Sequence, residues 1–285
     1  MAGAESLPPR GVRDVNARGV RTRAVTVGNP KKPALLLVHD FLVSHVEFEG
    51  ILDALAEHFF VIAPDLPGFG ESEKPNPAQY PYTIEALSEA VVDVIAALGV
   101  GRTSILGHGL GAAVAITIAA EHAELVQRLV LEDALCYPPP RKISPQLAHV
   151  PVLGGIFFKQ FYSRAMFRSY FQRLMLGPRA LVPSARIDRH YDLLTTPNAR
   201  ESAHTVMHTM LETRPVVARL GRIQKPALVV WGHEDRLLPV AHGQKLAHEI
   251  NGAKLQIIDG GHSPHEESPE RFVEHVTQFL LGKRG

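Results

Sequence analysis

Short apolar, β-rich runs alternate with helical stretches along most of this chain, and this alternation constrains the fold more than any other feature. The six clearest runs are residues 34–38, 59–63, 103–106, 129–131, 227–231 and 254–258. Between them lie amphipathic stretches such as 84–98, in which Leu87, Val91 and Val94 share one helical face. Strand–helix–strand repetition predicts an α/β fold, a mostly parallel, doubly wound sheet with helices on both faces.

Two regions of the chain depart from this alternation. Residues 12–15 and 20–27 flank an Asn-Ala-Arg-Gly turn and predict an antiparallel hairpin before the parallel strands. Between about 135 and 213 the pattern is helical and shows no strand. We therefore predict a core domain of residues 1–135 and 215–285, with an inserted helical cap at 136–214.

Composition and local hydropathy indicate where in the cell the protein is expected. The chain has 285 residues and one cysteine, Cys136, which excludes an internal disulfide framework and favours a reducing, cytoplasmic location. Residues 1–10 lack the apolar stretch of a signal peptide. The longest apolar run, 110–120, is shorter than the roughly 20 residues that cross a bilayer.

The charges are balanced overall but unevenly distributed. The net charge of +1 argues against a nucleic-acid partner. Residues 141–190, however, contain nine Lys or Arg and a single acid, Asp188, so the cap is strongly basic and the rest of the chain acidic. Aromatic side chains are interleaved with these cations: Phe157, Phe158, Phe161, Tyr162, Phe167, Tyr170 and Phe171. This pattern predicts an amphipathic cap helix over an apolar pocket, and as an alternative a weak contact of the basic cap with an anionic membrane surface.

Five glycine-rich or acidic motifs follow predicted strands. They are residues 36–41 (LLVHDF), 63–72 (APDLPGFGES), 107–111 (GHGLG), 231–235 (WGHED) and 260–264 (GGHSP). The 107–111 motif lies between a strand and a helix, as a nucleophile elbow does. Together the motifs resemble the α/β-hydrolase superfamily, specifically its cap-bearing branch of esterases, carbon–carbon bond hydrolases, epoxide hydrolases and haloalkane dehalogenases.

The resemblance assigns roles to individual positions. It implies that Asp235 is the acid and His262 the histidine of a catalytic triad, and that the N–H groups of Leu110 and Phe41 form the oxyanion hole. It places the nucleophile at position 109, where this chain has glycine. A hydrogen atom cannot attack a substrate, since covalent catalysis needs an oxygen or sulfur activated by a base.

A second departure is Asp40, which stands where the family usually has the glycine of a His-Gly pair. A carboxylate beside the oxyanion hole disfavours a developing oxyanion unless it points away or is neutral. The sequence leaves two alternatives of about equal weight, an outward-facing loop residue and a functional one.

Several functions remain open at this point. The first is a hydrolase of small to medium apolar acyl or related compounds, in which the His262–Asp235 dyad activates a water that occupies the space vacated at Gly109. The second is a catalytically silent protein whose cavity binds a ligand or whose cap engages a partner. The third is an inactivated variant of a Ser or Asp hydrolase. A lesser alternative is a lyase or a cofactor-independent oxygenase that uses the dyad to abstract a proton.

Other candidates carry less weight. Asp133 ends another strand and is a backup for the triad acid. We expect Ser44 to be a helix N-cap and Cys136 a buried, inert thiol. The histidines lack carboxylate or cysteine partners at metal-ligand spacing, and no phosphate-binding loop is present, so we predict neither metal nor cofactor. Oligomeric state and substrate identity are not encoded in these motifs.

Overall fold

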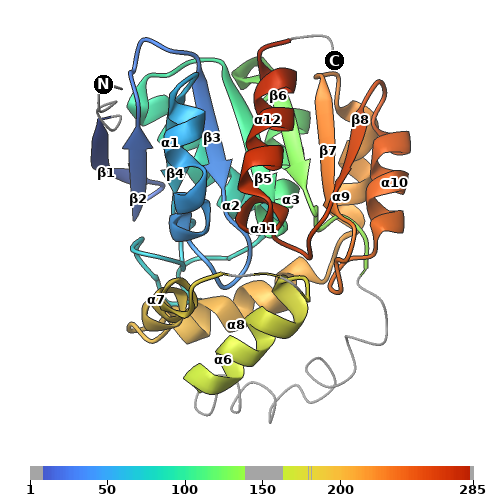
Figure 1. The fold of residues 1–285 in the computed structure, drawn as a ribbon. Coiled ribbons are helices and arrows are strands. Elements are labelled where there is room, and N and C mark those ends of the chain that lie inside the picture. The colour runs from blue at the N-terminus through green and yellow to red at the C-terminus, as the bar shows by residue number, and fades with distance from the viewer. Residues whose placement is uncertain (1–8, 139–162, 179, 181, 283–285) are drawn as a thin grey trace, which may run out of the picture.

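An eight-stranded sheet forms the centre of the protein in the computed structural model, which describes residues 9–138, 163–178, 180 and 182–282 (Figure 1). The strand order is β1-β2-β4-β3-β5-β6-β7-β8. The strands are β1 (Arg10–Ala17), β2 (Val20–Val27), β3 (Ala34–Val38), β4 (Phe60–Pro64), β5 (Thr103–His108), β6 (Val126–Glu132), β7 (Ala227–Gly232) and β8 (Lys254–Ile258). Each run predicted from the sequence is a strand, and the α/β fold is confirmed.

Strand direction follows the predicted pattern as well. β1 and β2 pair antiparallel, β2 pairs antiparallel with β4, and all pairs from β4 to β8 are parallel. The hairpin turn places both Arg18 and Gly19 at positive φ, 51° and 83°. Two successive residues with positive φ make the turn whose twist matches that of the flanking strands.

Helices cover both faces of the sheet. They are α1 (Leu52–Ala56), α2 (Ile84–Leu98), α3 (Leu110–Glu121), α9 (Arg214–Arg219), α10 (Val240–Glu249), α11 (Pro264–Glu267) and α12 (Pro269–Leu280), with 3₁₀ turns η1 (His45–Gly50), η2 (Ala123–Leu125) and η4 (Leu220–Arg222). Alternate β3 residues face opposite layers, because successive strand side chains point to opposite faces. Leu35 and Leu37 belong to one buried cluster with residues of α1 and α12, and Leu36 and Val38 to the other with residues of α2 and α3.

Helix α3 explains the longest apolar run of the chain. Its residues from Leu110 to Ala119 are all buried, so the helix runs through the core and has no solvent face. Among the described residues, no helix has both the length and the apolar character needed to span a membrane.

The described part of the insertion between β6 and β7 is helical. It contains α6 (Arg164–Tyr170), the π-helical turn η3 (Phe171–Met175), α7 (Ser184–Leu194) and α8 (Ala199–Met210). These elements lie below the carboxyl ends of the parallel strands in Figure 1. The aromatic residues Phe157, Phe158, Phe161 and Tyr162 fall outside the described residues. The domain limits at 136 and 214 stay a prediction.

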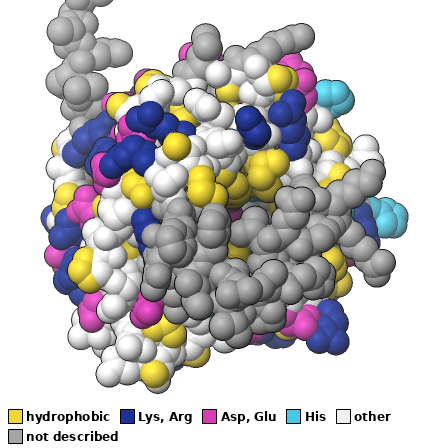
Figure 2. All heavy atoms as spheres, turned by 90° about the horizontal axis from the view of Figure 1, so that it is seen from below, with side chains coloured by type: hydrophobic (Ala, Val, Ile, Leu, Met, Phe, Trp, Pro, Cys, Tyr) yellow, Lys and Arg dark blue, Asp and Glu magenta, His cyan; other side chains and the backbone are white. Residues whose placement is uncertain are grey.

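Ion pairs join the cap to the core. Arg186 of α7 pairs with buried Glu266 at 3.0 Å, and Arg189 pairs with Glu49 of η1. Seen from the cap side, Lys and Arg side chains lie beside hydrophobic ones (Figure 2). The cap also neutralises its own cations, since Asp188 pairs with Arg168. The described cap arginines therefore already have acidic partners in several cases.

Candidate active site

The 107–111 motif forms a tight turn from β5 into α3. Gly109 has φ 51° and ψ −110°, a conformation that side chains rarely adopt. A Cβ at Gly111 would lie 2.0 Å from the backbone oxygen of Val38, so this glycine lets α3 approach β3. The turn lies between β5 and α3, where the sequence predicts a nucleophile elbow.

His262 and Asp235 meet beside this turn. Nδ1 of His262 lies 2.8 Å from Oδ2 of Asp235. The other carboxylate oxygen of Asp235 accepts the N–H groups of Leu237 and Leu238 at 2.7 and 2.9 Å. These bonds fix the carboxylate, which in turn fixes the imidazole, so the structure brings the two predicted residues together.

Asp133 lies behind this pair. It follows β6 with φ 40°, and its Oδ1 accepts the N–H of Gly232 at 3.0 Å. Burial and the neighbouring Asp235 carboxylate raise the pKa of Asp133 well above its usual range. The carboxylate that accepts the hydrogen bond of the imidazole belongs to Asp235, so the backup acid Asp133 is a neighbour of the acid that contacts His262.

Asp40 fills the space beside Gly109. A Cβ built on Gly109 would lie 2.0 Å from Oδ1 of Asp40 and 2.2 Å from its Cγ. The Asp40 side chain points inward and is 5% exposed, so the outward-facing alternative is wrong. The room expected for a water at the vacated elbow is also absent at this point, because the carboxyl group of Asp40 occupies it.

The Asp40 carboxylate contacts both remaining parts of the predicted machinery. Oδ1 accepts the N–H of Leu110 at 2.6 Å, and Oδ2 lies 3.2 Å from Nε2 of His262. The Leu110 N–H, which the sequence assigns to the oxyanion hole, therefore donates to a carboxylate oxygen, and its role in an oxyanion hole stays a prediction. Phe41, the next residue, packs edge-to-face on Phe69 with ring centroids 6.0 Å apart. The role of its N–H in an oxyanion hole stays a prediction.

These contacts determine the protonation states of His262 and Asp40. Burial would lower the pKa of His262, but the carboxylates of Asp235 and Asp40 outweigh it and raise the pKa to about 10. Burial would raise the pKa of Asp40, but the hydrogen bond from His262 and the charge of His108 lower it to about 2. At neutral pH the site holds an imidazolium between two carboxylates.

A second buried pair, Glu47 and His108, positions the first. Oε1 of Glu47 accepts the N–H of Asp40 at 3.1 Å, and its Oε2 lies 3.0 Å from Nδ1 of His108. Nε2 of His108 donates to the backbone oxygen of His262 at 2.7 Å. Glu47 and Glu132 raise the pKa of His108 to about 10 against the effect of burial. Glu47 lies in no motif of the sequence, and the available signal was its partner His108, which stands inside the 107–111 motif.

Several of these side chains also form clusters of possible metal ligands. Among the described residues, three sets have ligand atoms within 4.8 Å of one another: Asp40, His108 and His262; Glu47, His108 and His265; and Asp133, Asp235 and His262. Each set contains His108 or His262, whose raised pKa values keep them protonated at neutral pH. Each set also contains one of the ion pairs of the site: His262 with Asp40, His108 with Glu47, and His262 with Asp235.

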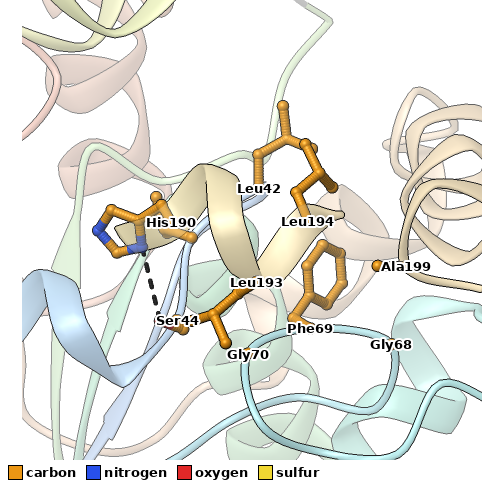
Figure 3. A pocket seen from close by; sticks show the side chains of 10 residues that line it. Leu42, Ser44, Gly68, Phe69, Gly70, His190, Leu193, Leu194 and Ala199 are labelled. Carbon is orange, nitrogen blue, oxygen red and sulfur yellow. Dashed lines mark hydrogen bonds between the residues drawn. The ribbon is translucent and has the colours of Figure 1, made fainter. Parts of the chain in front are cut away.

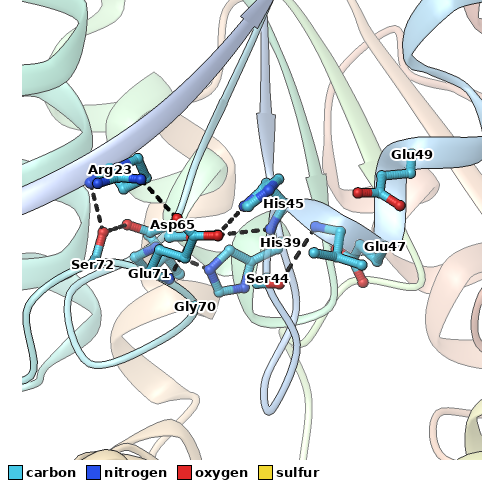
Figure 4. Close-up of polar contacts among 12 residues, drawn as sticks. Arg23, His39, Ser44, His45, Glu47, Glu49, Asp65, Gly70, Glu71 and Ser72 are labelled. Atoms are coloured by element: carbon cyan, nitrogen blue, oxygen red, sulfur yellow. Dashed lines mark hydrogen bonds and ion pairs between the residues drawn. The ribbon is translucent and has the colours of Figure 1, made fainter. Parts of the chain in front are cut away.

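Asp65 organises the 63–72 turn. Its Oδ1 accepts the N–H of His45 at 2.8 Å, and its Oδ2 accepts the N–H of Glu71 at 2.7 Å (Figure 4). A Cβ at Gly70 would lie 2.2 Å from Cγ of Asp65, which explains this glycine. Asp65 thus ties the turn to η1, which holds Glu47 below Asp40.

A small cavity separates the cap from this loop. Its volume is about 10 Å³, the space of about one water. Figure 3 shows Leu42, Phe69 and Leu194 beside Ser44 and His190. The lining is mainly apolar. Ser44 is the N-cap of η1, as predicted, and accepts the N–H of Val46 at 3.4 Å.

Cys136 and its surroundings agree with the prediction of an inert thiol. Its side chain is buried, and burial and the charge of Glu249 raise the pKa of the thiol. A thiol that stays protonated is a poor nucleophile.

Comparison with known proteins identifies the family. Residues 33–269 match the family described as "alpha/beta hydrolase fold". The chain belongs to the α/β-hydrolase family. It is 28% identical to an uncharacterized hydrolase, YugF, from Bacillus subtilis over 97% of this chain and 99% of that one. It is 27% identical to a putative carbamate hydrolase, RutD, from Agrobacterium fabrum over 81% and 86% of the two chains.

Solved structures of this α/β-hydrolase family superpose on nearly the whole chain. A serine hydrolase involved in carbazole degradation, the CarC enzyme, has a TM-score of 0.81 at 26% identity, covering 96% of this chain and 100% of that one. A membrane phospholipase A described as a bacterial virulence factor has a TM-score of 0.80 at 26% identity, covering 97% and 86%. The relatives thus include a serine hydrolase, whereas this chain has Gly109 at the elbow.

Proposed function

We propose that this chain hydrolyses small to medium apolar compounds at the site between the sheet and the cap, with His262 and Asp235 as its proton-transferring dyad. One observation carries the proposal: Asp235 holds Nδ1 of His262 at 2.8 Å while Nε2 faces the Asp40 carboxylate beside the elbow at 3.2 Å. An imidazole oriented in this way can move a proton to or from a bound substrate.

The charge of the site determines the order of the proton transfers. Because the pKa of His262 is raised to about 10, the imidazole carries a proton before substrate binds. Its first role is therefore that of an acid, and it becomes a base after it has donated. Direct attack of a water on a bound acyl group has less support, because Asp40 fills the elbow space and accepts the hydrogen bond of the Leu110 N–H.

The cap–core contact supports an apolar small molecule as the partner. Leu42, Phe69 and Leu194 line the cavity near the oxyanion loop. The proposed chemistry uses side chains alone, so it needs no cofactor. The cytoplasmic location stays part of the proposal and rests on the single Cys136. A weak membrane contact of the basic cap stays a prediction, weighed against the ion pairs that Arg164 and Arg168 make with Asp188.

Turnover of two apolar probes tests the function. Purified protein is assayed with 4-nitrophenyl butyrate and with styrene oxide, beside a His262→Ala variant and a control, His58→Ala, in which an exposed histidine is removed. We expect turnover of at least one probe, reduced about 10²-fold or more in His262→Ala and unchanged in the control. Absence of turnover, or full activity of His262→Ala, would contradict the proposal.

A catalytically silent, ligand-binding protein is the second candidate. The observation in its favour is that a carboxylate fills the elbow space and holds the oxyanion donor. A rise in melting temperature with apolar acyl compounds, without turnover, would support this candidate.

The third account, an inactivated serine or aspartate hydrolase, needs a paired experiment. Gly109→Ser or Gly109→Asp alone would place a Cβ 2.0 Å from Oδ1 of Asp40. A fair test therefore adds Asp40→Gly to each substitution. Gain of esterase activity by Asp40→Gly/Gly109→Ser would show that the nucleophile was the missing part.

A further inference from the structure

A groove lies at the edge of the sheet opposite to the cap. Its volume is about 810 Å³, and its lining comes from the open end of the β1–β2 hairpin, the amino ends of β3 and β4, and the segment between α2 and β5. The cap helices lie beyond the carboxyl ends of the parallel strands (Figure 1). The length of the strands therefore separates this groove from the candidate active site.

The lining of the groove is strongly basic. No Asp or Glu lines it, whereas five of its lining residues are Lys or Arg: Arg10, Arg13, Lys31, Lys32 and Arg102. The chain as a whole has a net charge of only +1, so this is a local excess of positive charge. A hollow lined by charges of one sign focuses the electric field and attracts counter-ions. The charge of the groove therefore favours an anionic ligand.

Two of the five cations are already held in place. Arg10 pairs with Asp53 at 2.8 Å. Nζ of Lys32 donates to the backbone oxygens of Ala56 and Glu57, at 2.9 and 2.6 Å, where α1 ends. An ammonium group has three N–H donors, so these two bonds fix its position without using all of them. Lys32 is thus a fixed positive charge, and no carboxylate of the described residues pairs with it.

The other three cations are available to a ligand. Arg13, Lys31 and Arg102 are exposed and pair with no acidic side chain in the part of the chain that the structure describes. They belong to three separate segments, since one lies in β1, one before β3 and one before β5. Nη1 of Arg13 donates to the backbone oxygen of Val12 at 3.0 Å and lies 3.5 Å from a Cβ built on Gly11. Cations from three segments around one groove can contact more than one anionic group of the same ligand.

Much of the remaining lining is apolar, and this narrows the ligand class. Phe60, Leu98 and Val100 line the groove and are half-buried, beside Pro30 and Pro33. Sites for organic ligands measure about 300–1,000 Å³ and combine apolar side chains with a few polar ones. Inorganic phosphate would use the cations and leave the apolar surface without a partner. A membrane surface is met by protruding apolar side chains, whereas a hollow favours a discrete molecule.

We propose that this groove binds a soluble organic polyanion that has at least two phosphate groups and a planar or apolar part, as in a nucleoside diphosphate. Arg13 and Arg102 bind phosphate oxygens, because a guanidinium offers paired N–H donors that match them. Lys31 and Lys32 add compact charges, and the apolar lining contacts the organic part. The site binds without a chemical step. It does not depend on the proposed hydrolase activity, so either proposal can fail while the other stands.

Calorimetric titration of the full chain tests the ligand class. ADP is compared with pyrophosphate and with adenosine, all without divalent metal. We expect ADP to bind at one site per chain, at least about tenfold more tightly than either fragment, and more weakly as the salt concentration rises. Absence of ADP binding would overturn the proposal. Equal affinity for pyrophosphate would overturn the organic polyanion in favour of an inorganic one. Binding to phosphatidylserine vesicles in place of ADP would overturn it in favour of a lipid surface.

Charge reversal locates the bound ADP. Lys31→Glu and Arg102→Glu should each weaken ADP binding about tenfold or more, because each removes a charged donor and adds a repelling carboxylate. Lys254→Glu reverses an exposed lysine at the amino end of β8, outside the groove, and is the matched control. We expect it to stay within about twofold of wild type. Circular dichroism confirms that the three variants are folded. Equal losses in Lys31→Glu and Lys254→Glu would show that ADP responds only to net charge, and the groove would then not be its site.

Discussion

Two buried histidines, one beside the sheet and one on the cap, have different charge states. His262, at the sheet end, is 2% exposed, and His190, on cap helix α7, is 1% exposed. Asp235 and Asp40 overcome the effect of burial at His262 and raise its pKa to about 10. At His190, burial and the nearby His39 lower the pKa to about 3.

The difference lies in the partners and not in the depth of burial. His262 has a carboxylate on each ring nitrogen. Nδ1 of His190 lies 3.5 Å from the hydroxyl of Ser44, its Nε2 has no hydrogen-bond partner among the described residues, and its ring stacks on Phe171 at 5.8 Å. Charge is therefore concentrated around His262, whereas the cap residues that line the small cavity, His190, Leu193, Leu194 and Ala199, are uncharged and mainly apolar. Such a division suits a substrate with an apolar body and one reactive polar atom.

Replacing each histidine by glutamine should give the largest contrast. His262→Gln leaves Asp40 and Asp235 buried without a counter-charge, and we expect it to lower the free energy of unfolding by about 3–5 kcal/mol. His190→Gln removes a neutral ring and its stacking, at a cost of about 1 kcal/mol. Urea unfolding monitored by circular dichroism measures both. Similar losses in the two variants would show that the His262 pairs carry no net charge stabilisation.

The contrast also marks the limit of prediction from sequence. The strands, the hairpin and the 84–98 helix follow local periodicity, and the structure has them at or within a few residues of the predicted bounds. Asp235 and His262 are assigned by the resemblance of the motifs after two strands to the α/β-hydrolase family, and the structure places the two side chains in contact. The inward direction of Asp40 depends on a contact with Gly109, 69 positions away, and local sequence does not encode it. The available signal was the coincidence of an extra acid in one loop with a missing side chain in the other.

The dependence of stability on pH should separate the two histidines. Since the folded pKa of His190 is about 3 and an unfolded histidine has about 6.5, the unfolded state binds the extra proton as the pH falls below 6.5. His190 should therefore cost up to about 2 kcal/mol of stability at pH 5 compared with pH 7. For His262, whose folded pKa is about 10, the stabilisation is complete below pH 6.5 and is lost as the pH rises toward 10.

Difference profiles isolate each contribution from the other titrating groups. The stability of wild type minus that of His190→Phe should fall between pH 7 and 5, and wild type minus His262→Gln should fall between pH 7 and 10. Urea midpoints at intervals of half a pH unit give both curves. A flat profile for His190→Phe would mean that His190 is charged or solvated in the folded protein.

Of these side chains, Ser44 should contribute least to the free energy of unfolding. Its contribution should come from its role as the N-cap of η1 and not from its contact with His190. Ser44→Ala removes the side-chain acceptor of the Val46 N–H, which should cost about 0.5–1 kcal/mol. Its contact with His190 is 3.5 Å long, at the outer limit of a hydrogen bond, and should add little. Thr83→Ala removes the N-cap of α2 at a residue that does not line the cavity and serves as the matched control, with a similar expected loss. A double-mutant cycle between Ser44→Ala and His190→Phe measures the coupling directly. Coupling above about 1 kcal/mol would show that the cap side of the site holds a strong polar pair after all, and the division between a charged sheet end and an apolar cap would then fail.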